Sequence, residues 1–211
     1  MTSPAPVALR ERTRRLMRAE LMDIAMALFA QQGYEATTID ELAQAAGMSK
    51  RTFFRYFGSK EDLVLGNQES IGEELAGALA ERPADEPPWL ALRRAFDLIV
   101  DRMDADPDRS AVLLRMLNET PVLLASQLAR RSRWRDLLAP HLLYRFDPPV
   151  RTDADPRALA MAGAALACYE AVQRTWLDSG RKVRISVLMD QAMSAVTPLE
   201  PDGQRSLSAA S

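Results

Sequence analysis

Residues 33–63 read GYEATTIDELAQAAGMSKRTFFRYFGSKEDL and carry the most informative pattern in the chain. Thr38 followed three residues later by Glu41 forms a capping box, which predicts the start of a short helix. Ser49 is a good N-cap for a second short helix. Gly47 lies between the two and permits a tight backbone turn. The sequence therefore predicts two short helices joined by a turn.

This pair of helices has the pattern of a helix-turn-helix. Phe53 and Phe57 lie four residues apart and are expected to anchor the second helix in a core. The start of that helix carries residues 50–52, Lys-Arg-Thr, whose side chains are donors suited to DNA bases and phosphates. A capped helical hairpin with a charged solvent face is the alternative that periodicity alone leaves open.

The flanking sequence is helical throughout. Helices are expected before and after this pair, at about Thr13–Gln32 and from Ser59 to about Ala80. Further helices are expected at Trp89–Asp104, Asp108–Glu119, Val122–Leu138, Pro156–Ser179 and Ile185–Val196. About nine helices and no alternating strand pattern indicate an all-α fold. We expect a flexible N-terminus (1–12), a domain that holds the helix-turn-helix (13–65), a C-terminal helical domain (66–196) and a flexible tail (197–211).

Composition excludes several classes of protein. The 211 residues are 47% apolar and 27% charged, which suits a globular chain. With one cysteine and one histidine, we expect no disulfide, metal site, cofactor or catalytic nucleophile–base pair. No run approaches the ~18 apolar residues of a membrane helix, and the arginine-rich start lacks the apolar block of a signal peptide. The sequence therefore favours a cytoplasmic protein that is not an enzyme.

Charge is unevenly distributed along the chain. Residues 1–60 hold nine Lys/Arg against six Asp/Glu, whereas the remainder holds eighteen against twenty-three. A basic N-terminal segment on an acidic body favours an anionic partner at one end only.

The same segment resembles the DNA-binding domain of the TetR family of bacterial transcriptional regulators. The resemblance covers about Arg14 to Leu65 and rests on the glycine after the first helix, the Thr-Thr cap, the Ala-x-x-Ala-Gly turn and the Phe-x-x-Lys-x-x-Leu entry into the fourth helix. It implies an N-terminal three-helix domain that binds double-stranded DNA. It also implies a C-terminal helical domain that dimerises and binds a small ligand.

The resemblance also assigns DNA-binding residues. Those implied are Thr38, Ser49, Lys50, Arg51, Thr52, Phe54, Arg55, Tyr56 and Lys60. Residues 50–52 fall where such regulators touch bases, and Tyr56 and Lys60 fall where they touch phosphates. Phe54 departs from the tyrosine common in the family, so it is expected either to press on a thymine methyl group or to pack as an ordinary apolar residue. Arg14, Arg15 and Arg18 either reach phosphates or form a solvated charge run.

The C-terminal domain carries two further expectations. Helix Pro156–Ser179 is rich in small residues and apolar on more than one face, so we expect it to form a homodimer interface with Ile185–Val196, although a core helix of a monomer is the alternative. Met-rich and aromatic helix faces indicate an apolar pocket, although ordinary core packing is the alternative for each residue. The candidate ligand-binding residues are Phe96, Ile99, Met103, Leu117, Trp134, Leu138, Met161, Cys168, Tyr169 and Trp176.

Part of this domain is similar to TetR-type regulators associated with mycofactocin gene clusters. The similarity rests on residues 116–121, Trp134 and residues 176–180, and it implies a long-chain acyl or acyl-CoA-like effector. The four arginines between residues 130 and 135 either meet an anionic head group or form an exposed basic face. Together these features predict a homodimeric repressor that binds a near-palindromic operator and is released by an apolar effector. The alternatives are an activator, an effector-independent regulator and, more distantly, a helical enzyme.

Overall fold

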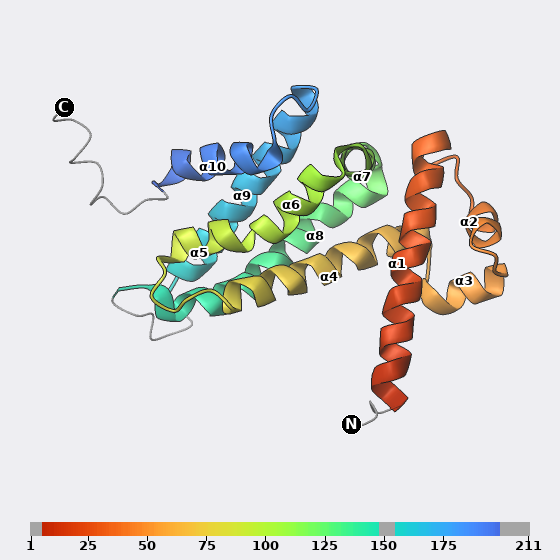
Figure 1. The fold of residues 1–211 in the computed structure, drawn as a ribbon, viewed down its shortest axis with the longest axis horizontal. Coiled ribbons are helices and arrows are strands. Elements are labelled where there is room, and N and C mark those ends of the chain that lie inside the picture. The colour runs from red at the N-terminus through yellow and green to blue at the C-terminus, as the bar shows by residue number, and fades with distance from the viewer. Residues whose placement is uncertain (1–5, 148–154, 199–211) are drawn as a thin grey trace. The chain divides into compact units, whose positions relative to one another are not determined.

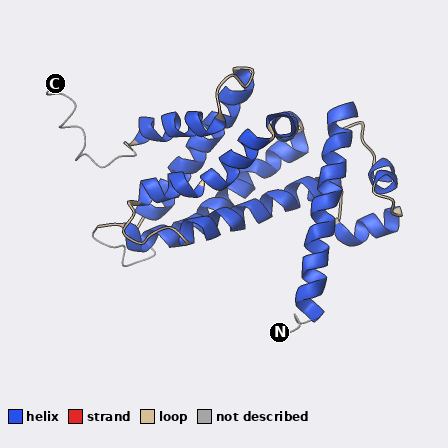
Figure 2. Cartoon of the chain, in the orientation of Figure 1, coloured by secondary structure: helices blue, strands red, loops and turns tan. Residues whose placement is uncertain are grey.

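The computed structural model describes residues 6–147 and 155–198, and every regular element in these ranges is a helix (Figures 1 and 2). The helices are α1 (Pro6–Gln32), α2 (Ile39–Ala45), α3 (Lys50–Tyr56), α4 (Lys60–Ala80), α5 (Pro88–Ala95), α6 (Asp97–Ala105), α7 (Pro107–Glu119), α8 (Pro121–Leu138), the short 3-10 helix η1 (Ala139–Arg145), α9 (Arg157–Asp178) and α10 (Ile185–Val196). The predicted all-α class is confirmed.

Two helix boundaries differ from the prediction. Helix α1 begins at Pro6 and not at about Thr13. A proline suits the first position of a helix, because its ring fixes φ and its missing N–H needs no partner there. The single helix predicted at Trp89–Asp104 is divided at Phe96, where the N–H of Ile99 bonds back only three residues and tightens the turn. The segments 1–5 and 199–211, predicted to be flexible, lie outside the described residues.

The chain divides into two compact units. The first comprises the described residues up to Ser70 together with Asp108–Leu128, and the second comprises Ile71–Pro107 and the described residues from Ala129 onward. Helices α4 and α8 therefore each contribute to both units. The division into domains 13–65 and 66–196 remains a prediction.

The first unit encloses the predicted anchors of the helix-turn-helix. Phe53 is 0% exposed and Phe57 is 2% exposed. The core that they join takes residues from α1, α2, α4, α7 and α8. Its buried members include Leu21, Ala25, Phe29, Leu42, Ala43, Leu63, Val64, Met116, Leu117 and Leu123. Burial of both phenylalanines fixes which face of α3 points outward.

The second unit is built around α9, which packs against α10, α5 and η1. The small residues of α9 allow close approach, since Ala158, Ala162 and Ala165 are all buried. Arg145 of η1 is also buried, and its guanidinium donates to the carbonyls of Leu79 and Arg82 at 3.2 and 2.9 Å. These bonds satisfy carbonyl groups at and just beyond the end of α4.

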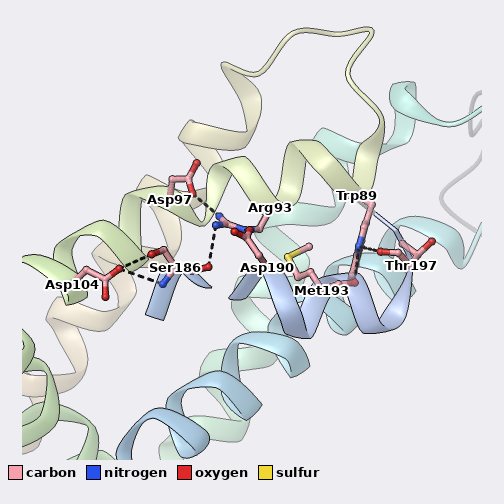
Figure 3. Close-up of polar contacts among 8 residues, drawn as sticks. All are labelled: Trp89, Arg93, Asp97, Asp104, Ser186, Asp190, Met193 and Thr197. Carbon is pink, nitrogen blue, oxygen red and sulfur yellow. Dashed lines mark hydrogen bonds and ion pairs between the residues drawn. The ribbon is translucent and has the colours of Figure 1, made fainter. Parts of the chain in front are cut away.

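Three polar side chains fasten α10 to α5 and α6 (Figure 3). Asp104 accepts a 2.8 Å hydrogen bond from the N–H of Ile185, the first residue of α10. Arg93 is 5% exposed and pairs with Asp190 in the middle of the helix. Trp89 Nε1 donates to the carbonyl oxygen of Met193 at 3.2 Å. Helix α10 is therefore held along its length by residues far away in the sequence.

Candidate DNA-binding and ligand-binding sites

The turn between α2 and α3 sets the direction of the predicted recognition helix. Gly47 has φ +62°, a conformation that favours glycine, and the N–H of Met48 bonds to the carbonyl of Ala43 at 2.9 Å. The Ser49 hydroxyl then caps α3 by accepting a 3.1 Å hydrogen bond from the N–H of Thr52. The predicted turn and N-cap are confirmed.

The outward face of α3 is cationic. Lys50, Arg51 and Arg55 are exposed, together with the ring of Phe54, which is 45% exposed. Thr52 and Tyr56 are partly exposed. Because Phe53 and Phe57 hold the opposite face in the core, these side chains are presented from a rigid element. The arrangement suits donation of hydrogen bonds to phosphates and base edges.

Lys50 already has a partner in the free chain. Its ammonium lies 3.0 Å from Oδ2 of Asp40, which is in the first turn of α2. Both side chains are more than half exposed, at 54% and 69%. DNA would therefore compete with Asp40 for this cation.

Thr38 acts as a cap in this structure. Its backbone N–H donates to the carboxylate of Glu41 at 2.8 Å, and its hydroxyl accepts from the N–H of Glu41 at 3.2 Å. The hydrogen bonds from Thr38 lower the pKa of Glu41. The capping box predicted from the sequence is confirmed, while a contact between Thr38 and DNA remains a proposal.

Lys60 has a structural role that sequence reasoning missed. Its ammonium donates to the carbonyl oxygens of Tyr34 and Thr37 at 2.7 and 3.0 Å and lies 4.2 Å from the centre of the Tyr34 ring. These contacts fasten the loop between α1 and α2. The Tyr34 hydroxyl in turn donates to Glu61 at 2.9 Å. No local spacing signals this network, because its partners are more than twenty residues apart.

The arginines of α1 differ in what they contact. Arg18 donates to the carbonyl of Tyr56 at 3.3 Å and its guanidinium lies 4.5 Å from the centre of the Phe57 ring, so it helps to pack α1 on α3. Arg14 is exposed. The side chain of Arg15 lies outside those described.

Nine of the ten predicted ligand-binding residues belong to the second unit, whereas Leu117 is buried in the core of the first. Within the second unit, the ring centres of Phe96 and Tyr169 lie 5.4 Å apart, and the Tyr169 hydroxyl donates to Met103 Sδ at 3.4 Å. Buried residues of the set include Ile99, Trp134, Leu138, Cys168 and Trp176, while Met161 and Tyr169 are partly buried.

Cys168 behaves as a buried apolar residue. It is 6% exposed, its sulfur lies 3.6 Å from the carbonyl of Ala192, and burial raises the pKa of its thiol. It therefore belongs to the contact between α9 and α10.

A cavity of about 540 Å³ lies in the first unit, between the end of α1, the following loop and α7. Phe29, Tyr34, Val112, Met116 and Pro121 are among its lining residues, and none of the predicted ligand-binding residues is. In the part of the chain that the structure describes, no helix is long and apolar enough to cross a membrane.

Comparison with known proteins identifies both halves of the chain. Residues 21–66 match the family model "Bacterial regulatory proteins, tetR family", and residues 86–201 match the model "MftR C-terminal domain". The chain is 32% identical over 206 residues to the HTH-type transcriptional regulator TcmR of Streptomyces glaucescens, an alignment that covers 93% of this chain and 90% of TcmR.

Among the solved structures that share the fold are two fatty acid regulators. The fatty acid degradation regulator FadR from Bacillus halodurans has a TM-score of 0.64 and 18% identity, and the alignment covers 90% of this chain and 96% of that one. FadR from Bacillus subtilis, solved in complex with stearoyl-CoA, has a TM-score of 0.62 and 17% identity over 86% of this chain and 99% of that one. Family and fold both point to a helix-turn-helix DNA-binding regulator and not to an enzyme. The chain belongs to the TetR family of bacterial transcriptional regulators, and its C-terminal domain is of the MftR type.

Proposed function

We propose that this chain acts in the cytoplasm as a homodimeric repressor, which binds a near-palindromic operator and leaves it when a small apolar effector binds the second unit. The observation that carries the DNA-binding part is the exposed cationic face of α3, held in place by buried Phe53 and Phe57. Phosphate contacts supply affinity that depends on salt but not on sequence, and base contacts supply discrimination.

The dimer part rests on α9 and α10. These helices expose the large apolar side chains Leu159, Val187 and Val196, which are 42%, 43% and 58% exposed. A two-fold axis placed beside the exposed sides of α9 and α10 would bury these side chains against a second copy of the chain. Two DNA-binding domains could then read half-sites about one helical turn apart, ~34 Å, on a near-palindrome.

The effector part rests on the packing of the second unit and on its relatives. Aromatic and sulfur-containing side chains gather at Phe96, Met103 and Tyr169, and such side chains suit adaptable apolar sites. One structural relative was solved with stearoyl-CoA bound, which supports a long-chain acyl compound as effector. Burial of ~200 Å² of acyl surface at about 25 cal/mol per Å² gives ~5 kcal/mol. That is close to the ~5.5 kcal/mol that shifts a two-state population from 1:99 to 99:1.

Selection of binding sites from a randomised duplex library, followed by a mobility-shift titration, tests the proposal. We expect a near-palindromic consensus, and we expect stearoyl-CoA or lauroyl-CoA to release the duplex. A selected site that neither acyl-CoA nor cell extract releases would indicate an effector-independent regulator. A reporter gene that falls silent when the regulator is deleted would indicate an activator. Failure to enrich any sequence would contradict the proposal as a whole.

A further inference from the structure

The cavity of the first unit has the size of a small-molecule site. Its volume of about 540 Å³ falls within the ~300–1,000 Å³ of pockets that hold small ligands. The lining residues come from the end of α1, the loop that follows it, the end of α7 and the start of α8, and all of them belong to the first unit. The cationic side chains of α3 do not line it. The cavity is therefore formed within one compact unit and is distinct from the face proposed to bind DNA.

The deeper part of the cavity is apolar. Phe29, Tyr34 and Met116 line it and are almost fully buried. The ring centres of Phe29 and Tyr34 lie 5.2 Å apart. Val112, which is partly exposed, adds an aliphatic side chain from α7. Two aromatic rings beside a thioether suit an apolar or aromatic ligand, because the thioether adapts to the shape it meets and rings pack well against rings.

The polar groups around Tyr34 already have partners. Its hydroxyl donates to Glu61 at 2.9 Å. The ammonium of Lys60 lies 4.2 Å from the centre of its ring and donates to two backbone carbonyls. Lys60 and Glu61 carry opposite charges, and neither lines the cavity. Tyr34 therefore contributes mainly its ring to the cavity, and the charge that a ligand meets is set by the other lining residues.

Three charged side chains line the cavity, and all three are exposed at its rim. They are Glu35 of the loop after α1 and Arg115 and Glu119 of α7. Arg115 and Glu119 are four residues apart on one helix face, so their opposite charges partly offset each other. Glu35 adds a second carboxylate from a different element. The rim therefore has one more negative than positive charge, above an apolar and aromatic interior.

We infer that this cavity is a ligand site distinct from the proposed effector site of the second unit, and that it takes an aromatic molecule with a single ammonium group. The aromatic part packs on Phe29, Tyr34 and Met116, and the ammonium group meets Glu35 at the rim. An ammonium group is also attracted to the faces of aromatic rings. The lining loop, residues 33–36, leads directly to the Thr38 cap of α2, so the ligand contacts the segment from which the helix-turn-helix begins.

Three matched naphthalene compounds test the charge assignment. They are 2-naphthylmethylamine, 2-naphthalenemethanol and 2-naphthoate, which are cationic, neutral and anionic at neutral pH, and each is titrated into the full chain by calorimetry at low salt. Wild-type protein is expected to bind the amine at least ~3-fold more tightly than the alcohol, and the naphthoate most weakly. Glu35→Gln should remove most of the preference for the amine. Glu20→Gln, at an exposed position of α1 outside the cavity, is the control and should keep it.

A second pair of variants tests the place of binding. Ala30 is an exposed lining residue, so Ala30→Trp should fill the cavity and weaken binding of the amine at least ~10-fold, a loss of ~1.4 kcal/mol. Ala19→Trp, at an exposed position of the same helix outside the cavity, is the control and should bind as wild type does.

Circular dichroism checks the fold of each variant. If Ala30→Trp does not fold, methyl NMR of the methionines in the wild type replaces it. The amine should then shift the signal of Met116, which lines the cavity, and leave that of Met193, which is buried in the second unit. No binding of the amine at millimolar concentration, binding that survives Ala30→Trp, or an unshifted Met116 signal would overturn the site. Equal binding of the amine and the alcohol, or tighter binding of the naphthoate, would overturn the ammonium assignment.

Discussion

At the scale of single residues, one cation of α3 is already paired with a carboxylate in the absence of DNA. Lys50 lies 3.0 Å from Asp40 across the turn between α2 and α3. Both side chains are exposed, so the pair contributes little to the stability of the fold. Its effect is on binding, because Asp40 is an anion placed beside a cation that the operator needs.

Replacement of Asp40 by asparagine should therefore strengthen binding to all DNA sequences alike. One repulsive charge is lost and one cation is freed, so we expect several-fold tighter binding and a salt dependence steeper by about one counterion. Fluorescence anisotropy with operator and random duplexes at several salt concentrations measures both quantities. Asp136→Asn removes an exposed, paired carboxylate in the second unit and serves as the control. Unchanged or weaker binding by the Asp40 variant would contradict this role.

At the scale of elements, α4 packs closely against α8 at one glycine. A Cβ on Gly72 would overlap Nε1 and Cδ1 of Trp134. Gly72→Ala should thus lower the free energy of unfolding by ~1–3 kcal/mol through overpacking. Gly77→Ala in the same helix meets nothing within 4 Å and should raise it by up to ~1 kcal/mol. Urea denaturation measures the free energy of unfolding of both variants. An equal change in the two variants would contradict the close contact between Gly72 and Trp134.

The attachment of α10 gives a pH-dependent prediction. Burial alone would raise the pKa of Asp104, but hydrogen bonds from Ser186 and from the N–H of Ile185 lower it overall. A carboxyl whose pKa is lower in the folded state stabilises the fold above its ordinary pKa, ~3.9, and that contribution is lost as pH falls through the lower value. Asp104→Asn should cost ~0.5–2 kcal/mol of unfolding free energy at pH 7, as for a lost helix cap.

The difference between wild type and Asp104→Asn should shrink as the solution is acidified below ~pH 4. Urea denaturation at pH 7 and pH 3 measures it. Asp101→Asn, an exposed position on α6, is the matched control and should differ little from wild type at either pH. A constant difference between Asp104→Asn and wild type at both pH values would show that the carboxylate does not act as a cap.

Local signals explain which elements could be predicted from the sequence. The Thr38 capping box, the Ser49 cap and the turn at Gly47 each depend on residues within a few positions, so the helix-turn-helix was predictable. The break at Phe96, the bonds of Lys60 and the burial of Arg130 depend on contacts formed only in the folded chain. Sequence spacing placed Arg130 and Arg133 in one basic run, whereas the fold buries the first and exposes the second.

At the scale of the whole molecule, the proposal requires two copies. Val187 is 43% exposed on α10, so Val187→Asp places a charge in the proposed interface without disturbing the core of one copy. We expect light scattering to report monomers at micromolar concentration and operator binding to fall sharply, because one DNA-binding domain lacks sufficient contact area. Leu124→Asp, at a residue 49% exposed on α8, is the control for an exposed apolar position. A wild-type monomer under these conditions would exclude the dimer.

The central claim is that the exposed face of α3 reads DNA, and one titration tests it most directly. Wild-type protein and a Lys50→Ala/Arg51→Ala double variant are titrated against the selected duplex by fluorescence anisotropy at fixed salt, with folding checked by circular dichroism. Wild type should bind with a Kd of ~10⁻⁸ M or below. The double variant should keep its fold and bind at least ~30-fold more weakly, since each good base contact contributes ~1–3 kcal/mol. A folded double variant that binds the duplex as tightly as wild type would contradict the account.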